Sequence, residues 1–355
     1  MLTMQVTQVI DCTPNELLVR DGSGPIQVRV SGESGRNSWL NDCFPCRSDR
    51  AYMKAVTKEK LTPYTKDFVT SADGTRIGYR QLGSGPGVVL LHGGVNASQH
   101  LMRLGSALAG TFTVYIPDRR GRGMSGPLGA YYGLRAEDED LAVLLKQTGA
   151  RNVFGVADGA LFALHGALSL PNIEKVAAYE PLLFLDQARL DKFLGFMQQF
   201  DQQLARGRLG DAIVTTIKGS GTPKSWAWIP RPLLAPFLSF GMRVEARRIR
   251  GDDVPLQDLL PTIHYEIELV KQTAGTLDDY RGVAADVLLL YGSKTDSMFK
   301  VTAKALQSVL PHAICIELPD LDHRSARNYG KPERIAPVLQ LFFHPARPQP
   351  SSANA

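Results

Sequence analysis

Residues Val153–His165 read V-F-G-V-A-D-G-A-L-F-A-L-H. An apolar run comes first, small residues follow at Gly155, Gly159 and Ala160, and a helical pattern of apolar residues begins after them. A sharp turn from a strand into a helix needs small residues at these places, because a Cβ atom there would strike the turning backbone. The stretch therefore predicts a buried strand that turns abruptly into a helix, with Ala157 midway between the two glycines.

The whole chain has 355 residues, of which 44% are hydrophobic and 21% charged, and its formal net charge is +5. This length suits one large α/β domain with an insertion, and this composition supports a globular core. The basic excess is not gathered into Lys/Arg blocks, so we expect no nucleic-acid partner. No run approaches the roughly 20 apolar residues that span a bilayer, so we expect no membrane partner either.

Four cysteines in a chain of this length indicate a reducing compartment, and the first residues show neither a basic nor a long apolar segment of a secretory signal. We therefore predict a cytoplasmic protein. Cys43 and Cys46 form a C-x-x-C pair, but no second pair or histidine pair completes a zinc site. The sequence predicts no metal.

Two glycine-rich segments precede the Val153–His165 stretch. The continuous apolar run Gly87–Leu91, which is typical of a strand covered on both faces, ends in His92-Gly93-Gly94. The strand predicted at Phe112–Ile116 leads into D-R-R-G-R-G-M-S-G, which begins at Asp118. We assign this second segment a structural role, as a tight loop.

A change of pattern follows the strand Lys175–Tyr179, which ends in Glu180-Pro181. Residues 182–282 contain no convincing strand, but they contain amphipathic helical stretches at 190–205, 234–249 and 263–273, which predicts a helical cap. Within it, Trp226 and Trp228 could line an apolar substrate cavity, or could simply pack the cap on the core. We interpret four of its arginines as a solvated face: Arg243, Arg247, Arg248 and Arg250.

Strand patterns resume at Val287–Tyr291 and Ile314–Leu318, with Asp296 after the first of these strands and His323 after the second. Residues 1–60 read as an N-terminal extension of uncertain order, with strands near Glu16–Arg20 and Ile26–Val30. Residues 344–355 are rich in Pro and Ser, which predicts a disordered tail.

Together these segments resemble the α/β-hydrolases, in the order glycine loop, D-R-R-G-R-G-x-S, strand-to-helix turn, cap, acid and histidine. The turn resembles the nucleophile elbow G-x-S-x-G of that family, except that Ala157 stands where serine would be. The resemblance implies a mostly parallel central sheet with helices on both faces. It also implies a core of residues 61–181 and 283–343, with the cap inserted at 182–282.

The resemblance also assigns roles to residues of this chain. It implies that His323 is the general base, and that the N–H groups of Gly94 or Val95 and of Asp158 bind the developing oxyanion. The residue that orients His323 stays open between Glu180, which we favour because it sits at a strand end, and Asp296. Asp158 as nucleophile is disfavoured, because that frame would place bulky side chains where the turn needs small ones.

The function that the resemblance implies is hydrolysis of an ester or lactone bond in a small apolar substrate, without a metal or organic cofactor. Because a methyl group cannot attack a carbonyl, we expect the chain to be inactive with Ala157. One alternative is a natural non-hydrolytic member, either a small-molecule binder or a catalyst using His323 as acid and base. Another is a plain interaction module. Whether the chain forms a homodimer is left open.

Overall fold

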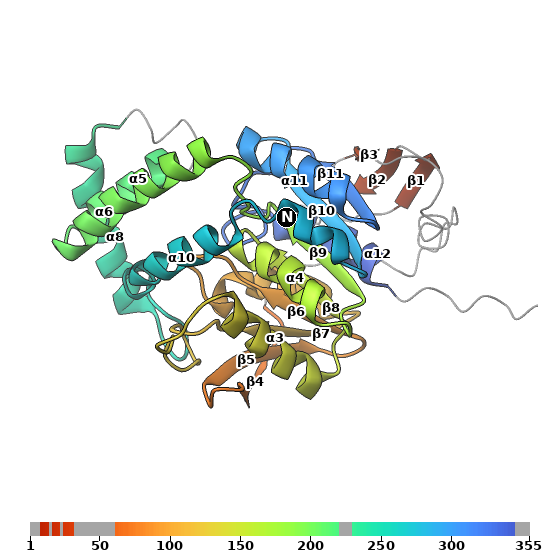
Figure 1. The fold of residues 1–355 in the computed structure, drawn as a ribbon, viewed down its shortest axis with the longest axis horizontal. Helices are drawn as coiled ribbons and strands as arrows, with labels where there is room; N and C mark the ends of the chain where they lie inside the picture. The colour runs from red at the N-terminus through yellow and green to blue at the C-terminus, as the bar shows by residue number, and fades with distance from the viewer. Residues whose placement is uncertain (1–7, 14–15, 22–23, 32–60, 220–228, 345–355) are drawn as a thin grey trace, which may run out of the picture.

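The computed structural model describes residues 8–13, 16–21, 24–31, 61–219 and 229–344 (Figure 1). The predictions for Trp226 and Trp228, for the pair Cys43 and Cys46, and for residues 345–355 fall outside the described residues.

The described strands form one sheet in the order β1-β2-β3-β11-β10-β9-β8-β6-β7-β5-β4. Their bounds are β1 Gln8–Thr13, β2 Glu16–Asp21, β3 Gly24–Ser31, β4 Thr65–Thr70, β5 Arg76–Gly83, β6 Gly87–Leu91, β7 Thr113–Pro117, β8 Asn152–Val156, β9 Lys175–Tyr179, β10 Asp286–Gly292 and β11 Ala313–Leu318. The six strands from β7 to β11 in this order run parallel, whereas β4 and β5 are antiparallel at one edge. From β4 to β11 the sheet is therefore mostly parallel, as predicted.

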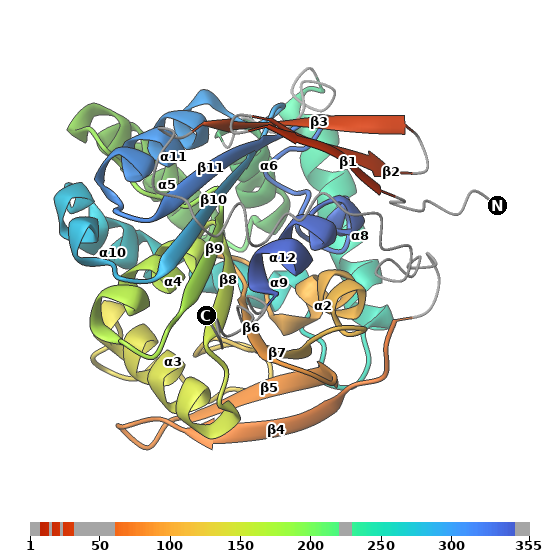
Figure 2. The same cartoon turned by 90° about the vertical axis from the view of Figure 1, so that its right-hand side faces the viewer.

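Three N-terminal strands continue the sheet beyond β11, at the opposite edge from β4 and β5 (Figure 2). Strand β3 pairs antiparallel with β11, with Val30 opposite Ile316. The two strands predicted in residues 1–60 correspond to β2 and β3, and β1 is a further one. The described part of the N-terminal extension is therefore an addition to the sheet.

Helices cover both faces of the sheet. Their bounds are η1 Ser98–Leu101, α2 Met102–Leu108, α3 Leu134–Thr148, α4 Asp158–Ser169, α5 Gln187–Ala205, α6 Leu209–Gly219, α8 Arg231–Arg248, α9 Leu256–Leu259, η2 Leu260–Thr262, α10 Ile263–Thr273, η3 Leu277–Gly282, α11 Ser297–Val309, η4 Pro332–Arg334 and α12 Ala336–Phe343. Helices α2 and α12 lie on one face, and α3, α4 and α11 on the other (Figure 2).

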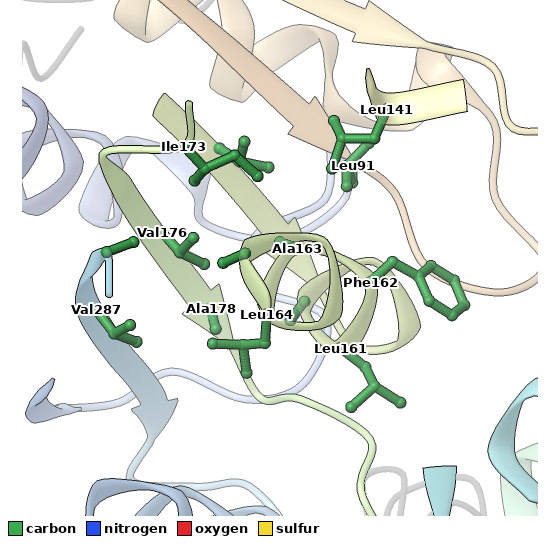
Figure 3. Close-up of a cluster of buried hydrophobic side chains, with 14 of the residues drawn as sticks. Leu91, Leu141, Leu161, Phe162, Ala163, Leu164, Ile173, Val176, Ala178 and Val287 are labelled. Atoms are coloured by element: carbon green, nitrogen blue, oxygen red, sulfur yellow. The ribbon is translucent and has the colours of Figure 1, made fainter. Parts of the chain in front are cut away.

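Alternation along each strand divides the core into two layers. In β6, Val88 and Leu90 pack with α2 and α12, whereas Val89 and Leu91 pack with α3 and α4. Successive side chains of a strand point to opposite faces, so a strand covered on both sides is apolar throughout. In the second layer, α4 rests on Val176 and Ala178 of β9 (Figure 3). This packing fixes the position of the turn that precedes α4.

Between β9 and β10 the described residues of 182–282 form helices and no strand. Helices α5, α6 and α8 lie to one side of the sheet (Figure 1), whereas η3 packs with α4 and α11. Helices α5, α8 and α10 occupy the predicted helical stretches, whereas α6 was not predicted. Its run of Val214, Thr215 and Thr216 has weak helix propensity. Packing overrides that propensity, because Val214 is fully buried among residues of α8.

Candidate active site

The turn between β8 and α4 places Ala157 in a strained backbone conformation, with φ 55° and ψ −114°. Such a conformation costs on the order of 1–3 kcal/mol and persists only where the surroundings impose it. Here the Ala157 N–H donates a hydrogen bond of 3.0 Å to the Tyr179 carbonyl oxygen. A Cβ on Gly155 would lie 2.1 Å from the Gly159 carbonyl oxygen, and one on Gly159 would lie 2.4 Å from that of Leu91. Both glycines are therefore required by the turn, as the sequence predicted.

A histidine–carboxylate pair is formed by residues from two other loops, which also lie at the carboxyl ends of the parallel strands. Glu180 follows β9 and His323 follows β11, and His323 Nδ1 lies 2.8 Å from Glu180 Oε2. Glu180 has no exposed surface, and burial of its carboxyl group is costly unless hydrogen-bond donors surround it. Those donors are His323, the Gly292 N–H at 2.9 Å and the Thr295 hydroxyl at 2.8 Å.

The ring of His323 is held in a defined orientation. It stacks on the Phe299 ring, with centroids 4.5 Å apart and planes 14° apart. Because a carboxylate can only accept, this contact assigns the proton of a neutral imidazole to Nδ1 and leaves the lone pair on Nε2. This is the tautomer in which an imidazole can act as a general base.

Asp296, the alternative acid, has a different partner. It is the N-cap of α11, and its carboxylate accepts the Met298 N–H at 2.8 Å. Thr295, one residue earlier, is the residue that contacts Glu180. The expected contact between Glu180 and His323 is present, and Asp296 serves a helix terminus.

The glycine loop after β6 reaches the same turn. A Cβ on Gly93 would lie 3.2 Å from the Ala157 methyl carbon and 3.7 Å from the guanidinium of Arg327. Arg327 also donates to the His323 carbonyl oxygen at 3.0 Å. Through these contacts the glycine loop, the turn at Ala157 and the loop that carries His323 lie together.

The side chain of Asp158 contacts the glycine loop in a way that the sequence did not predict. Its Oδ2 accepts the Gly94 N–H at 2.7 Å. A Cβ on Gly94 would lie 2.7 Å from the same oxygen, so only glycine permits this approach. Val95, the next residue, has a backbone φ of 54°, in the left-handed region that favours glycine. One of the N–H groups that we expected to bind substrate oxygen is therefore occupied by a carboxyl group of the protein.

Asp158 also faces a second buried acid, Glu266 of α10. Burial, followed by the charge of Glu266, raises the pKa of Asp158 to about 7. Burial also acts to raise the pKa of Glu266, but the attraction of Arg119 and Arg122 outweighs it and lowers that pKa. The proton of the pair therefore resides on Asp158, while Glu266 stays ionised.

The arginines of the D-R-R-G-R-G segment connect this acid pair to the rest of the core. Arg119 donates to Glu266 at 2.9 Å and to Glu137 of α3 at 3.0 Å, and Arg122 also pairs with Glu266. All of these side chains are buried. The loop therefore has its predicted structural role and also joins the inserted helix α10 to the core.

Glu266 was missed by the sequence reasoning, although a signal for it exists. It lies three residues after Ile263 and four before Val270, within the apolar stripe of an amphipathic helix. A charged residue in such a stripe is buried only with a partner.

The residues that the structure describes contain no group of three or more His, Cys, Asp or Glu that could hold a metal ion.

Comparison with known proteins shows the family to which a chain with this fold and this turn belongs. A sequence profile described as the alpha/beta hydrolase family matches residues 88–338, which is well over half of the chain. The protein therefore belongs to the alpha/beta hydrolase family, as the motifs predicted.

Individual relatives are distant. A 3-hydroxybutyrate-oligomer hydrolase of Cupriavidus necator is 24% identical over 269 residues, which are 72% of this chain and 87% of that protein. Among solved structures, an alpha/beta hydrolase from Sphaerobacter thermophilus has a TM-score of 0.62 and 28% identity, covering 78% of this chain and all of that chain. A thermophilic esterase from Thermogutta terrifontis has a TM-score of 0.58 at 17% identity, covering 78% of this chain and 97% of that chain, and it shows the fold alone.

Proposed function

We propose that this is the site of a serine-type ester or lactone hydrolase in which alanine stands at the nucleophile position. The chain would then bind its substrate without turning it over. The observation that carries the proposal is the 2.8 Å contact between His323 and the buried Glu180, beside a turn that holds Ala157 at φ 55°. Strained backbone clusters at active sites, so this turn beside an oriented histidine supports residue 157 as the reacting position.

The reaction that a hydroxyl at position 157 would support follows from these groups. His323 Nε2 would take the hydroxyl proton while the oxygen attacks the carbonyl carbon, and Glu180 would stabilise the imidazolium. The Asp158 N–H, with that of Gly94 or Val95, would bind the developing oxyanion. His323 would return its proton to the leaving alcohol, and water would then hydrolyse the acyl-enzyme by the same steps.

An apolar substrate fits the surroundings of the glycine loop. Val95 packs against an apolar cluster of the insertion that includes Met197, Phe200 and Met242. In this proposal the described residues of 182–282 act as a cap over the site. The similarity of this chain to a protein described as a 3-hydroxybutyrate-oligomer hydrolase supports a small ester as the substrate.

A second candidate is a non-hydrolytic function, and one observation favours it. The Gly94 N–H already donates to Asp158 Oδ2, so a substrate oxygen would have to displace that carboxyl group. With a methyl group at residue 157, the site would bind a small molecule or use His323 as an acid and base. In that case alanine would be the functional residue at position 157, and the site would not be that of a hydrolase that has lost its serine.

The test is Ala157→Ser, assayed against a series of nitrophenyl esters and small lactones, with the unsubstituted chain and Ala157→Gly as controls. Hydrolase ancestry predicts turnover at least about 10²-fold above both controls, the lower range of what a positioned general base contributes. Turnover should also be lost in Ala157→Ser/His323→Ala. If Ala157→Ser binds the same ligands as the unsubstituted chain but turns none over, the non-hydrolytic candidate replaces the first.

A further inference from the structure

The inserted helix α8 (Arg231–Arg248) carries large apolar side chains on its outward side. Leu233, Phe237 and Phe240 are 69%, 63% and 65% exposed. Steps of four and three residues place them on one face of the helix. Single exposed apolar residues are ordinary, but three on one face mark a contact surface. We call Leu233, Phe237 and Phe240 the apolar stripe of α8.

The apolar stripe is not needed to hold α8 in place. The opposite side of the helix already packs on the protein, with Leu234 and Ala235 buried beside Val214 of α6. One turn later Met242 joins a second buried cluster that contains Phe200 of α5. The helix therefore buries one apolar side and exposes another. It lies along the outer margin of the insertion (Figure 1).

Basic side chains continue the same outward side toward the end of α8. Arg243, Arg247 and Arg248 are exposed, and their side chains make no ion pair or hydrogen bond with the described residues. Glu245 is the acid of this helix, and it turns away to accept the Leu256 N–H at 3.1 Å. The outward side of α8 is therefore apolar in its first half and positively charged in its second half.

We propose that the outward side of α8 docks on the surface of an anionic lipid bilayer. The apolar stripe enters the boundary between headgroups and acyl chains, and the three arginines contact lipid phosphates. A helix that combines a bulky apolar face with basic residues binds anionic lipid surfaces, because its apolar and its basic side chains can both make their contacts in the plane of the interface. Arginine suits phosphate because its planar guanidinium donates two parallel hydrogen bonds.

Charge complementarity selects the lipid surface over a second copy of the chain. A two-fold dimer centred on the apolar stripe would pair the apolar residues of the two copies, but it would offer Arg243, Arg247 and Arg248 no acid from the other α8, because Glu245 faces away. An anionic bilayer presents the opposite charge. Among the described helices none is long and apolar enough to span a bilayer, so the contact is with the surface. This revises the interpretation of these arginines as a merely solvated face, and our expectation of no membrane partner.

The experiment is co-sedimentation of the full chain with vesicles. Vesicles of equal parts phosphatidylcholine and phosphatidylglycerol should bind the protein, and vesicles of phosphatidylcholine alone should bind it much less. Raising sodium chloride from about 0.1 M to about 1 M, which shortens the Debye length from about 10 Å to about 3 Å, should release most of it. No binding to the anionic vesicles would overturn the proposal.

Two sets of variants locate the contact. Phe237→Ser/Phe240→Ser should lower the partition coefficient at least tenfold. Arg243→Gln/Arg247→Gln/Arg248→Gln should lower it about a hundredfold, at about fivefold for each arginine near an anionic surface. Matched controls remove exposed groups elsewhere: Tyr131→Ser, at a residue 97% exposed, and Arg135→Gln/Arg151→Gln/Arg281→Gln, at side chains 92%, 64% and 63% exposed.

The controls should bind vesicles as the unsubstituted chain does, and thermal melting should show all variants folded. Equal losses in the control set and the α8 set would contradict the assignment to this helix. If light scattering shows a dimer that Phe237→Ser/Phe240→Ser dissociates while vesicle binding persists, the face belongs to a second copy. Vesicle binding needs no turnover, so this test stands apart from that of the proposed function.

Discussion

The carboxylate of Glu180 holds His323 from a strand end on the far side of β10, with Oε2 and Nδ1 2.8 Å apart. Glu180 lies next to the end of β9, and its backbone N–H donates to the Leu290 carbonyl oxygen at 2.9 Å. The glutamate side chain accepts the N–H of Gly292, the last residue of β10, with one oxygen and contacts His323 with the other. The carboxylate is thereby carried by the first residue after β9, whose backbone is still bonded to β10.

We predict that Glu180 and not Asp296 orients the histidine. In an Ala157→Ser background, Glu180→Gln should lower turnover by roughly 10⁴, by analogy with replacement of the triad acid. Asp296→Asn is the matched control and should change little, because asparagine is also a favourable helix N-cap. Steady-state kinetics on one ester compares the two. A large loss in Asp296→Asn with little change in Glu180→Gln would assign the acid to Asp296.

The Thr295 hydroxyl should contribute to stability through its hydrogen bond to the buried Glu180 carboxylate. Thr295→Val keeps the shape and removes the donor, so the free energy of unfolding should fall by roughly 1.5–3 kcal/mol, as for hydrogen bonds to charged groups. Thr295→Ser keeps the hydroxyl and should lose much less. Urea unfolding measures both, and a Thr295→Val variant that loses no stability would contradict the contribution of the hydrogen bond.

The turn at Ala157 should not tolerate a side chain at Gly155. A Cβ there would lie 2.1 Å from a backbone oxygen, which cannot move as a side chain can, so Gly155→Ala should prevent stable folding. Gly195→Ala is the control, since a Cβ on Gly195 of α5 meets nothing within 4 Å. That change should stabilise the protein by up to about 1 kcal/mol, the helix-propensity difference. A cooperative melt of Gly155→Ala near the temperature of the unsubstituted chain would contradict the geometry.

Ionisation of Asp158 should destabilise the protein as the pH rises. Burial and the charge of Glu266 raise its pKa from 3.8 to about 7, so the folded state binds this proton more tightly than the unfolded state. Stability from this group is complete below the unfolded pKa and is lost as pH rises through the folded pKa, with a total loss of up to roughly 4 kcal/mol. Asp158→Asn keeps the donor and acceptor and cannot ionise.

Urea unfolding of the unsubstituted chain and of Asp158→Asn at several pH values from 4 to 8 tests this expectation. The unsubstituted chain should lose stability relative to the variant across this window. Two curves that stay parallel would show that Asp158 already ionises freely in the folded protein.

The sequence predicted those features that depend on local chain geometry. Gly155 and Gly159 identify the turn because no other residue fits beside its backbone. The resemblance to the α/β-hydrolases identified His323, and the carboxyl ends of parallel strands bring both Glu180 and Asp296 within reach of it, so the sequence favoured Glu180 without excluding Asp296.

Contacts between distant segments could not be predicted in this way. The meeting of Asp158 with Gly94 depends on a side-chain rotamer that no spacing reveals. Glu266 reaches Arg119 across 147 positions of the chain, and only the packing of α10 brings them together. The formation of α6 also depends on neighbours, since its own propensity is weak. No motif in β3 or in β11 predicts that these two strands pair.

The most direct test of the account is phosphonylation of Ala157→Ser by an alkyl fluorophosphonate, followed by mass measurement of the intact protein. A serine at this position, with His323 as its base, would displace fluoride and form one covalent bond to phosphorus. We predict one adduct per chain in Ala157→Ser, none in the unsubstituted chain, and a rate at least about 10²-fold lower in Ala157→Ser/His323→Ala. A folded Ala157→Ser that forms no adduct, or forms one equally fast without His323, would contradict the assignment of residue 157 and His323 as nucleophile position and base.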